Sequence, residues 1–239
     1  MATFVSLTIP CYNEGNFIFK AVKELEKVMD STKYRYEIIL FDDKSKDNTA
    51  ENIRKIAASD KKARAFFHKE NQGRGQTVKD AIEESRGSIV GFIDIDLEIP
   101  AHYVPAMVNA IEEGYDAAIA ERIDKLSLKQ MHRHLLSKGY QAIVKTALKI
   151  TIKDTEAGCK FFNKKTMLAL IRKTENKHWF WDTEIMALAF YYGKRIKEIP
   201  VVFQKNPESK STVKIFSDAK KYLKEVHKFR KRMKKEGKI

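Results

Sequence analysis

The sequence predicts a single α/β domain built on a mostly parallel β-sheet with helices on both faces. Short apolar runs typical of buried strands alternate with helical patterns through the first half of the chain. Three of these runs end in acidic residues, and ligands of such sheets gather at the carboxyl ends of the strands. The 239 residues, of which 43% are hydrophobic, suffice for one full core but are few for two.

In the first half, each strand is expected from an apolar run and each helix from apolar residues on one stripe. Residues 4–9 are mostly apolar and stop at Pro10, and the stripe that follows supports an amphipathic helix. The alternation of strand and helix favours parallel strands with helical connections. The expected strands are residues 4–9, 37–41, 63–67 and 88–95, and the expected helices are residues 18–29, 48–58 and 77–85.

The second half of the chain is less regular. The expected strands are residues 115–120 and 159–162 with an extended stretch at 195–203, and the expected helices are residues 126–150 and 183–192. A polar loop at residues 204–212 precedes a basic tail. Because there is no internal repeat and no low-complexity linker, residues 1–213 are expected to form one domain.

The tail, residues 214–239, is expected to be a basic amphipathic helix. It holds 11 basic and 3 acidic residues, so it carries +8 of the formal net charge of +14. Such a helix suits an anionic membrane surface, or it docks its apolar stripe on the domain. We expect docking near its start and attraction to lipid near its end, so that removing residues 228–239 leaves the core intact. The apolar stripe consists of Ile215, Ala219, Tyr222, Val226, Phe229 and Met233.

Several classes of protein are disfavoured. No uncharged apolar stretch reaches the length of about 18 residues needed to span a bilayer, and the start of the chain lacks a signal-peptide pattern. Cys11 and Cys159 are far apart and suggest no disulfide framework. The six histidines show no metal-ligand spacing, and no Ser-His-Asp arrangement is indicated. We therefore expect a cytoplasmic protein that is peripheral to the membrane.

Acidic residues follow the fourth expected strand. If that strand continues through Asp94 and Asp96, their carboxylates point to the same face, and Glu98 is placed to join them. Unpaired carboxylates are costly, and hard oxygen ligands favour Mg²⁺ or Mn²⁺ shared with the phosphates of a ligand. The pattern predicts a metal site. The alternative is a polar strand end covered by solvent.

The first two strands end in residues suited to a nucleoside. After the first strand, Tyr12 offers an aromatic face for a base, and Glu14 offers a carboxylate for ring nitrogens or ribose hydroxyls. The alternative for this segment is an ordinary loop at a helix start. After the second strand, Asp43 is placed to meet a nucleoside, whereas Ser45 and Asp47 more simply cap the next helix.

A glycine-rich segment, Asn71-Gln-Gly-Arg-Gly75, follows the third strand. A dinucleotide-binding fingerprint is rejected because Val78 stands where the third glycine would be and because the segment does not follow the first strand. The glycines predict a tight turn or a close approach of the backbone.

Together these motifs resemble the family 2 glycosyltransferases of the GT-A fold, in the order and spacing of that family. The resemblance implies a three-layer α/β fold with a mostly parallel central sheet, a nucleotide diphosphate sugar as donor, and inversion at the anomeric carbon. It also implies that Asp96 holds the metal bound to the diphosphate. The family usually has Thr or Ser in place of Cys11 and Gln in place of Glu98. The matching segments are Pro10-Cys-Tyr-Asn-Glu14, Asp42-Asp-Lys-Ser-Lys-Asp47, Asn71-Gln-Gly-Arg-Gly75 and Asp94-Ile-Asp96. The residues that the resemblance places around the base and ribose are Pro10, Tyr12, Glu14 and Asp43.

The second half resembles the polyprenyl-phosphate (dolichyl-phosphate) mannosyl- and glucosyltransferases. Arg133 and Ser137 are four residues apart on an expected helix, so they share a face that can grip a phosphate. Their spacing, with Arg122 after a strand, resembles the residues that hold the lipid phosphate in those enzymes. Residues 154–162 and 180–184 are also similar to segments of those enzymes.

Asp182 has two interpretations at this point: a catalytic residue, or the cap of the helix that follows it. The three neighbouring rings at residues 179–181 are expected to place at least one side chain in the core.

The sequence thus predicts transfer of a hexose from a donor of the GDP-mannose or UDP-glucose type to a polyprenyl or dolichyl phosphate, with Asp96 and Arg122 in the reaction. A lipid phosphate is already anionic and attacks without a strong base. If the acceptor is instead a sugar hydroxyl of a glycan or glycolipid, a base is needed, and Asp182 or Asp154 is the candidate. A basic module for membranes or nucleic acid explains the tail but not the acidic strand ends, which repel nucleic-acid phosphates. No nucleic-acid partner is expected.

Overall fold

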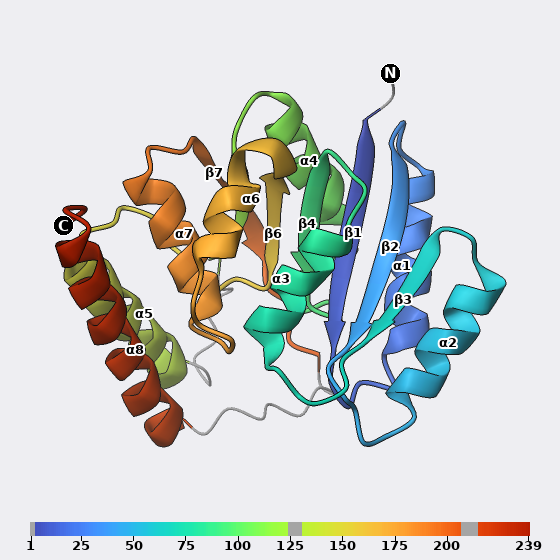
Figure 1. Cartoon of the computed structure of the whole chain (residues 1–239), viewed down its shortest axis with the longest axis horizontal. Helices are drawn as coiled ribbons and strands as arrows, with labels where there is room; N and C mark the ends of the chain where they lie inside the picture. Colours follow the sequence, from blue (N-terminus) through green and yellow to red (C-terminus); the bar gives the residue numbers. More distant parts are fainter. Residues whose placement is uncertain (1–2, 124–130, 207–214) are drawn as a thin grey trace.

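The protein is represented by a computed structural model that describes residues 3–123, 131–206 and 215–239; for residues 131–138, 140 and 215–219 only the backbone is described. Seven strands form a sheet in the order β3-β2-β1-β4-β6-β5-β7 (Figure 1). β6 runs antiparallel to β4 and β5, and the other pairs are parallel. The strands are β1 (Phe4–Cys11), β2 (Arg35–Asp42), β3 (Ala63–Phe67), β4 (Ile89–Ile93), β5 (Ala117–Ile123), β6 (Cys159–Asn163) and β7 (Ile196–Val202).

Helices cover both faces of this sheet. α1, α2 and α4 lie on one face, and α3, α6 and α7 lie on the other, whereas α5 and α8 pack together at the side of the molecule (Figure 1). The predicted mostly parallel three-layer α/β fold is therefore confirmed. The helices are α1 (Ile18–Asp30), α2 (Thr49–Ser59), α3 (Arg74–Glu84), α4 (Val104–Glu112), α5 (Met131–Leu148), α6 (Lys164–Lys173), α7 (Trp181–Tyr191) and α8 (Ile215–Lys235), with a short 3₁₀ helix, η1 (Ala101–Tyr103), before α4.

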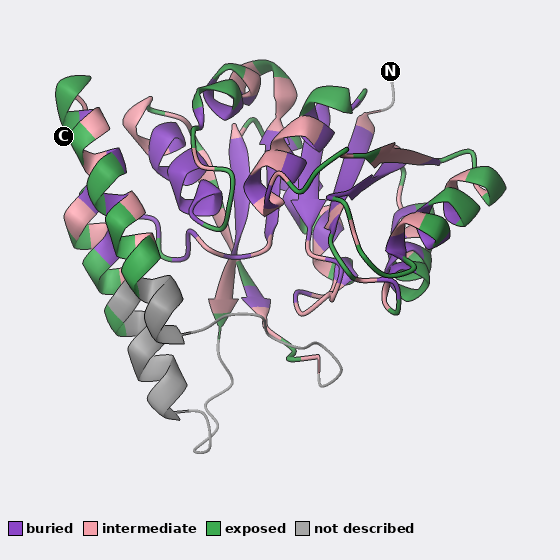
Figure 2. Cartoon of the chain, turned by 60° about the horizontal axis from the view of Figure 1, so that its bottom comes forward, coloured by how far each residue is buried: buried purple, intermediate pink, exposed green. Residues whose placement is uncertain are grey.

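The core lies between the sheet and its two helical layers, so the central strands are buried on both faces. β4 is buried along its whole length, and the helices turn their buried sides toward the strands (Figure 2). Burial on both faces explains why these strands read as nearly continuous apolar runs in the sequence. Both cysteines are free and buried, as expected from their spacing.

Two helices were not predicted, and several boundaries were wrong; β5, for example, runs to Ile123, so Arg122 lies on this strand and not after it as expected. α4 and α6 were missed, although both carry buried residues at helical spacing. α3 begins at Arg74 rather than Thr77, and α7 begins at Trp181, so Asp182 lies inside the first turn of α7 instead of capping it. β4 ends at Ile93 rather than at residue 95 because the chain turns there, with Leu97 N donating to Asp94 O at 3.1 Å.

The basic tail docks on the domain through its middle and last turns. Val226, Phe229 and Met233 of α8 are buried in a second apolar cluster with residues of α5 and α7. Arg232 adds ion pairs to Glu184, 2.9 Å away and buried on α7, and to Glu175 at 3.0 Å. The expectation that residues 228–239 leave the core intact when removed is therefore wrong. No helix in the described part of the chain is long and apolar enough to cross a membrane.

Candidate active site

The loops with the predicted site residues meet at one edge of the sheet. Because β1 to β5 run in the same direction, their carboxyl ends lie together at the lower edge in Figure 1, and the amino end of the antiparallel β6 joins them there. This acidic edge therefore collects residues from the loops after β1, β2 and β4, from the last part of β5 and from the segment before β6. The residues concerned are Glu14, Asp43, Asp94, Asp96, Arg122 and Asp154.

The loops after β1 and β2 fix each other. Asn13 N donates to Ser45 Oγ at 2.9 Å, and Asn13 Oδ1 accepts from Lys46 N at 2.7 Å. Asn13 and Lys44 both have positive φ, 58° and 62°, which non-glycine residues adopt only under constraint. Asp47 accepts from Gly15 N and from Thr49 N, so it joins the loop after β1 to the start of α2. Tyr12 stays 43% exposed beside these loops.

Asp43 holds the glycine-rich loop in place. Its carboxylate accepts from Gln72 N at 2.7 Å and from Gly73 N at 2.8 Å, and His68 Nδ1 lies 2.7 Å from Asp43 Oδ1. Gly73 has φ of 95°, and a Cβ there would lie 2.4 Å from His178 and 2.5 Å from Lys177 O, so of the two predicted uses of glycine the structure shows the close approach of the backbone. Asp43 is buried by these contacts, and contact with a nucleoside remains a prediction for this residue.

Asp94 and Asp96 come together in a turn rather than on an extended strand. The expectation that they share a strand face is wrong, because β4 ends at Ile93. Gly158 supports the turn: its carbonyl accepts from Asp94 N at 2.9 Å, and a Cβ on Gly158 would lie 1.9 Å from Asp94 Oδ2. Burial, followed by the charge of Asp94, raises the pKa of Asp96 to about 6.

Glu14 faces the same carboxylates. Burial raises the pKa of Glu14 to about 7, and the charges of Asp96, Asp47 and Asp94 add to that rise. Within the described residues, neither Glu14 nor Asp96 has an ion-pair partner. This excess of carboxylate oxygens fits a hard divalent cation.

Within the same residues, however, no three Asp, Glu, His or Cys side chains form a complete metal site. Bound phosphates would therefore have to supply further oxygens. Glu98 lies beside Asp96 and accepts from Asn206 N at 3.2 Å. Its role as a metal ligand remains a prediction.

Asp94 belongs to a cluster of four charged residues with Arg74, Asp182 and Lys160. Arg74 donates to Asp94 Oδ1 from Nη2 at 2.6 Å and also donates to Asp182. Lys160, fully buried, donates to the other oxygen of Asp182 at 2.6 Å and to Ala157 O at 2.6 Å. The two cations balance the two carboxylates, which such a buried group requires.

Arg122 and Asp154 form a second paired site. Arg122, on the last part of β5, donates to Asp154 from Nε at 2.6 Å and from Nη2 at 2.9 Å. Burial favours the neutral form of Asp154, but the hydrogen bonds and charge of Arg122 outweigh it and hold the pKa of that carboxyl below its ordinary value. Arg122 keeps 27% of its side chain exposed at the edge of the sheet.

Comparison with known protein families decides the family. A model described as glycosyl transferase family 2 matches residues 6–169, which include all the acidic loops and β6. The chain belongs to glycosyltransferase family 2.

Relatives of this family 2 glycosyltransferase include "Glycosyltransferase AglD" of Haloferax volcanii, 30% identical over 86% of the chain. Another is "Dolichyl-phosphate beta-glucosyltransferase" of Saccharomyces cerevisiae, 27% identical over 90% of the chain. The chain spans 34% of the Haloferax protein and 71% of the yeast enzyme.

A solved structure with the same fold is glucosyl-3-phosphoglycerate synthase from Mycobacterium tuberculosis, in complex with Mn²⁺, UDP and glucosyl-3-phosphoglycerate. Its TM-score to this chain is 0.73 at 16% identity, with 95% of this chain and 80% of that chain covered. This likeness confirms the predicted GT-A fold.

Two residues of this family 2 glycosyltransferase carry contacts that were not anticipated. Arg74 lay within a matching motif but had no predicted role, and Lys160 had none. The lysine inside the otherwise apolar run of β6 could have indicated a buried acidic partner, because an unpaired buried ammonium is too costly to keep. Asp182, for which a catalytic role and a capping role were both open, contacts Arg74 and Lys160, and its catalytic role remains a prediction.

The remaining predicted residues lie elsewhere. Arg133 and Ser137 lie on α5, outside the residues whose side chains are described. Of the three neighbouring rings, Phe180 and Trp181 are buried, as predicted for at least one, while Trp179 is 55% exposed.

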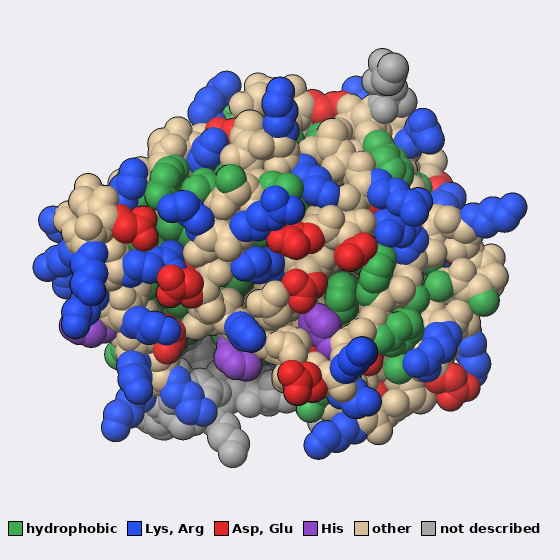
Figure 3. All heavy atoms as spheres, viewed as in Figure 1, with side chains coloured by type: hydrophobic (Ala, Val, Ile, Leu, Met, Phe, Trp, Pro, Cys, Tyr) green, Lys and Arg blue, Asp and Glu red, His purple; other side chains and the backbone are tan. Residues whose placement is uncertain are grey.

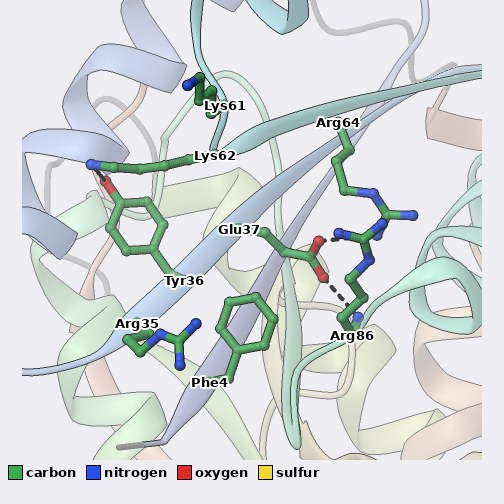
Figure 4. A pocket seen from close by; sticks show the side chains of 8 residues that line it. All are labelled: Phe4, Arg35, Tyr36, Glu37, Lys61, Lys62, Arg64 and Arg86. Carbon is green, nitrogen blue, oxygen red and sulfur yellow. Dashed lines mark hydrogen bonds and ion pairs between the residues drawn. The ribbon is translucent and has the colours of Figure 1, made fainter.

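One hollow in the described part of this family 2 glycosyltransferase lies away from the acidic edge. A cavity of about 300 Å³ lies at the amino ends of β1 and β2, across the sheet from the site (Figure 4). There Glu37 accepts from Arg64 Nη1 at 2.9 Å and from Arg86 N at 2.7 Å. Because Glu14 and Asp96 follow the carboxyl ends of their strands, a ligand bound to them would not reach this cavity at the amino ends. It is lined by Phe4, Arg35, Tyr36, Glu37, Lys61, Lys62, Arg64 and Arg86.

Proposed function

We propose that this family 2 glycosyltransferase moves a hexose from a nucleotide diphosphate sugar, of the GDP-mannose or UDP-glucose type, to a polyprenyl or dolichyl phosphate, with inversion. The observation that carries the proposal is that both carboxylates suited to act as a base are already held by cations. Asp154 is paired with Arg122, and Asp182 is paired with Arg74 and Lys160.

A carboxylate held in this way is a poor general base, because protonating it would leave buried cations without a partner. A hydroxyl acceptor needs such a base, whereas a phosphate acceptor is already anionic. The paired carboxylates therefore support the phosphate acceptor over a sugar hydroxyl. The name of the yeast relative, a dolichyl-phosphate glucosyltransferase, supports the same class of acceptor.

The donor side of the proposal rests on the unpaired carboxylates of Glu14 and Asp96. Pro10, Tyr12, Glu14 and Asp43 are proposed to hold the base and ribose. Asp94 and Asp96, with Glu98 beside them, are proposed to hold Mg²⁺ or Mn²⁺. When bound, the metal would neutralise the charge that develops on the leaving diphosphate. The Mn²⁺ and UDP bound to the structural neighbour support this arrangement.

The acceptor is proposed to bind at the same edge of the sheet as the donor. Arg122, with Arg133 and Ser137 on α5, is proposed to bind the lipid phosphate, because Asp154 fixes a guanidinium of the right charge for phosphate oxygens at this edge. The membrane contact is proposed for the outward face of α8, where Lys and Arg side chains gather at the left of the molecule (Figure 3).

A transfer assay with defined acceptors tests the proposal. The full chain is incubated with Mn²⁺ and either GDP-mannose or UDP-glucose, together with a polyprenyl phosphate, the matching polyprenol or a glycolipid with a free sugar hydroxyl. We expect sugar on the polyprenyl phosphate alone, with the anomeric configuration of the product inverted by NMR. Equal transfer to the glycolipid would support the hydroxyl acceptor instead.

The proposed membrane contact is tested by substituting charged residues and not by truncation, because the last turns of α8 belong to the core. Replacing the exposed Lys224, Lys228, Lys231 and Lys235 with Gln keeps the buried stripe. We expect weaker, less salt-sensitive binding to anionic vesicles, by about 1 kcal/mol for each lysine near the surface. The matched control replaces four exposed lysines on other helices: Lys20, Lys23, Lys55 and Lys165. Equal loss in the control would mean that α8 has no special part in binding.

A further inference from the structure

Trp179 stands out among the aromatic residues near the site. Its neighbours belong to the core: Phe180 is buried, and Trp181 is fully buried with Nε1 donating to Thr174 Oγ1 at 2.9 Å. Trp179, between His178 and these buried rings, leaves 55% of its surface exposed. A single exposed ring is ordinary on a protein surface, so its position has to decide whether it has a role.

The position of Trp179 is set by the active site. The guanidinium of Arg74 lies 5.1 Å from the centre of the Trp179 ring and 5.2 Å from that of Phe92, so it is held between two aromatic faces. The same guanidinium is tied to Asp94 and Asp182 and cannot move freely. The indole is thus held one side chain away from the proposed metal carboxylates.

The backbone that carries Trp179 is also fixed. Gln76 N, in the first turn of α3, donates to Lys177 O at 3.1 Å, and Trp181 N donates to His178 O at 3.1 Å. A Cβ on Gly75 would lie 2.4 Å from Trp181, so the glycine-rich loop and this segment pack directly together. The segment that carries the exposed ring is therefore held in place, and the ring itself contacts Arg74.

We propose that Trp179 is the platform on which the hexose of the nucleotide sugar rests, a residue that determines how well the donor's sugar is bound. A pyranose ring has a face of C–H groups that stacks on an aromatic ring, and hydroxyls at its rim that need polar partners. Arg74 contacts both the Trp179 ring and Asp94, so a polar group for such a rim is one side chain away from the indole. This inference rests on the proposed function, because it assumes a sugar donor at the acidic edge.

The two tryptophans of the chain make the test direct. Acrylamide should quench the fluorescence of the exposed Trp179 but not that of the buried Trp181. With Mn²⁺ present, we expect a nucleotide sugar to protect Trp179 from the quencher, and the matching nucleoside diphosphate to protect it much less. Trp179→Phe should remove the quenchable signal and so assign it.

Affinities give the second arm. Trp179→Ala should weaken nucleotide-sugar binding about three- to tenfold, as expected for one lost aromatic contact, with nucleoside diphosphate binding unchanged. Trp179→Phe, which keeps a ring, should retain most of the affinity. The matched control is Tyr115→Ala, which removes a ring in contact with Arg195 at the far end of β5 and should change neither affinity.

The outcomes separate this inference from the proposed function. If no nucleotide sugar stabilises the wild-type chain with Mn²⁺, the proposed function fails. If a nucleotide sugar binds but leaves Trp179 open to acrylamide, and Trp179→Ala binds it normally, the platform is overturned. Protection by anionic vesicles alone, without donor, would make Trp179 a membrane contact and overturn it equally.

Discussion

The proposed donor half of the site and the proposed acceptor half differ in whether their carboxylates are paired with cations. In the first half, Glu14 and Asp96 have no cation beside them among the described residues, and their pKa values rise to about 7 and about 6. In the second half, Asp154 and Asp182 are each held by buried or half-buried cations. The same residue type therefore has two uses at one edge of the sheet.

The difference indicates what each half receives. A group of crowded, unpaired carboxylates is stabilised by an added cation, so the first half suits a metal with a diphosphate. A carboxylate already paired with arginine or lysine instead fixes that cation in place, so the second half suits an anion. Substitutions that exchange the two states should break this division of roles.

The largest effect is expected at Asp96. Asp96→Asn keeps the shape of the side chain but removes the charge that attracts the metal, so we expect activity to fall by at least about 10²–10³-fold. The fold should survive, because the substitution also removes repulsion from Asp94. Initial rates at saturating Mn²⁺ and circular dichroism measure the two effects. Full turnover in excess chelator would contradict the metal site.

Asp182 should show the opposite balance, with a large loss of stability. Asp182→Asn leaves Lys160 buried without its anion, so we expect a loss of about 3–5 kcal/mol in the free energy of unfolding. The double variant Lys160→Met with Asp182→Asn removes both charges and should recover part of that loss. Urea unfolding measures both. A double variant no more stable than Asp182→Asn would mean that the pair is not what holds this region.

The sequence was a good guide to the sheet and to the acidic loops, because both leave local signals. Apolar runs and the residues that end them place β1, β2 and β4 and put Glu14, Asp43 and Asp94 at one edge. The cations that pair with the carboxylates could not be predicted in this way. Arg74 lies 108 residues from Asp182, and Lys160 is 22 residues from it, so only the folded chain brings them together.

The tail shows the same limit. The apolar stripe of α8 was visible in the sequence, but its depth of burial was not. Met233 is fully buried only because α5 and α7 supply the surface that covers it, and an amphipathic pattern fits a membrane and a protein surface equally well.

Arg122 tests the acceptor half with a smaller effect. Removing Arg122 alone would strand buried Asp154, so the informative variant is Arg122→Met with Asp154→Asn. We expect the KM for polyprenyl phosphate to rise about 10- to 100-fold, as for one or two lost charge-assisted hydrogen bonds. Asp154→Asn alone is the control. Steady-state kinetics should leave donor affinity nearly unchanged, and an equal loss of donor binding would move Arg122 to the diphosphate.

The smallest effect, and the one that most directly compares the halves, is the pH dependence of stability. The folded-state pKa of Glu14 lies near 7, above its ordinary 4.5, so its neutral form favours the fold and ionisation costs stability as pH rises through 7. Glu14→Gln should therefore be more stable than the wild type at pH 8, by about 1 kcal/mol in the free energy of unfolding after screening, and the difference should vanish near pH 5.

Asp154, with a lowered pKa, has the reverse sign: its stabilisation is present above its ordinary pKa of 3.8 and is lost only below it. Asp154→Asn should then be less stable than the wild type by a constant amount from pH 5 to 8. Melting curves across this range decide the matter, and parallel pH profiles for the two variants would mean that the two halves are not electrostatically distinct.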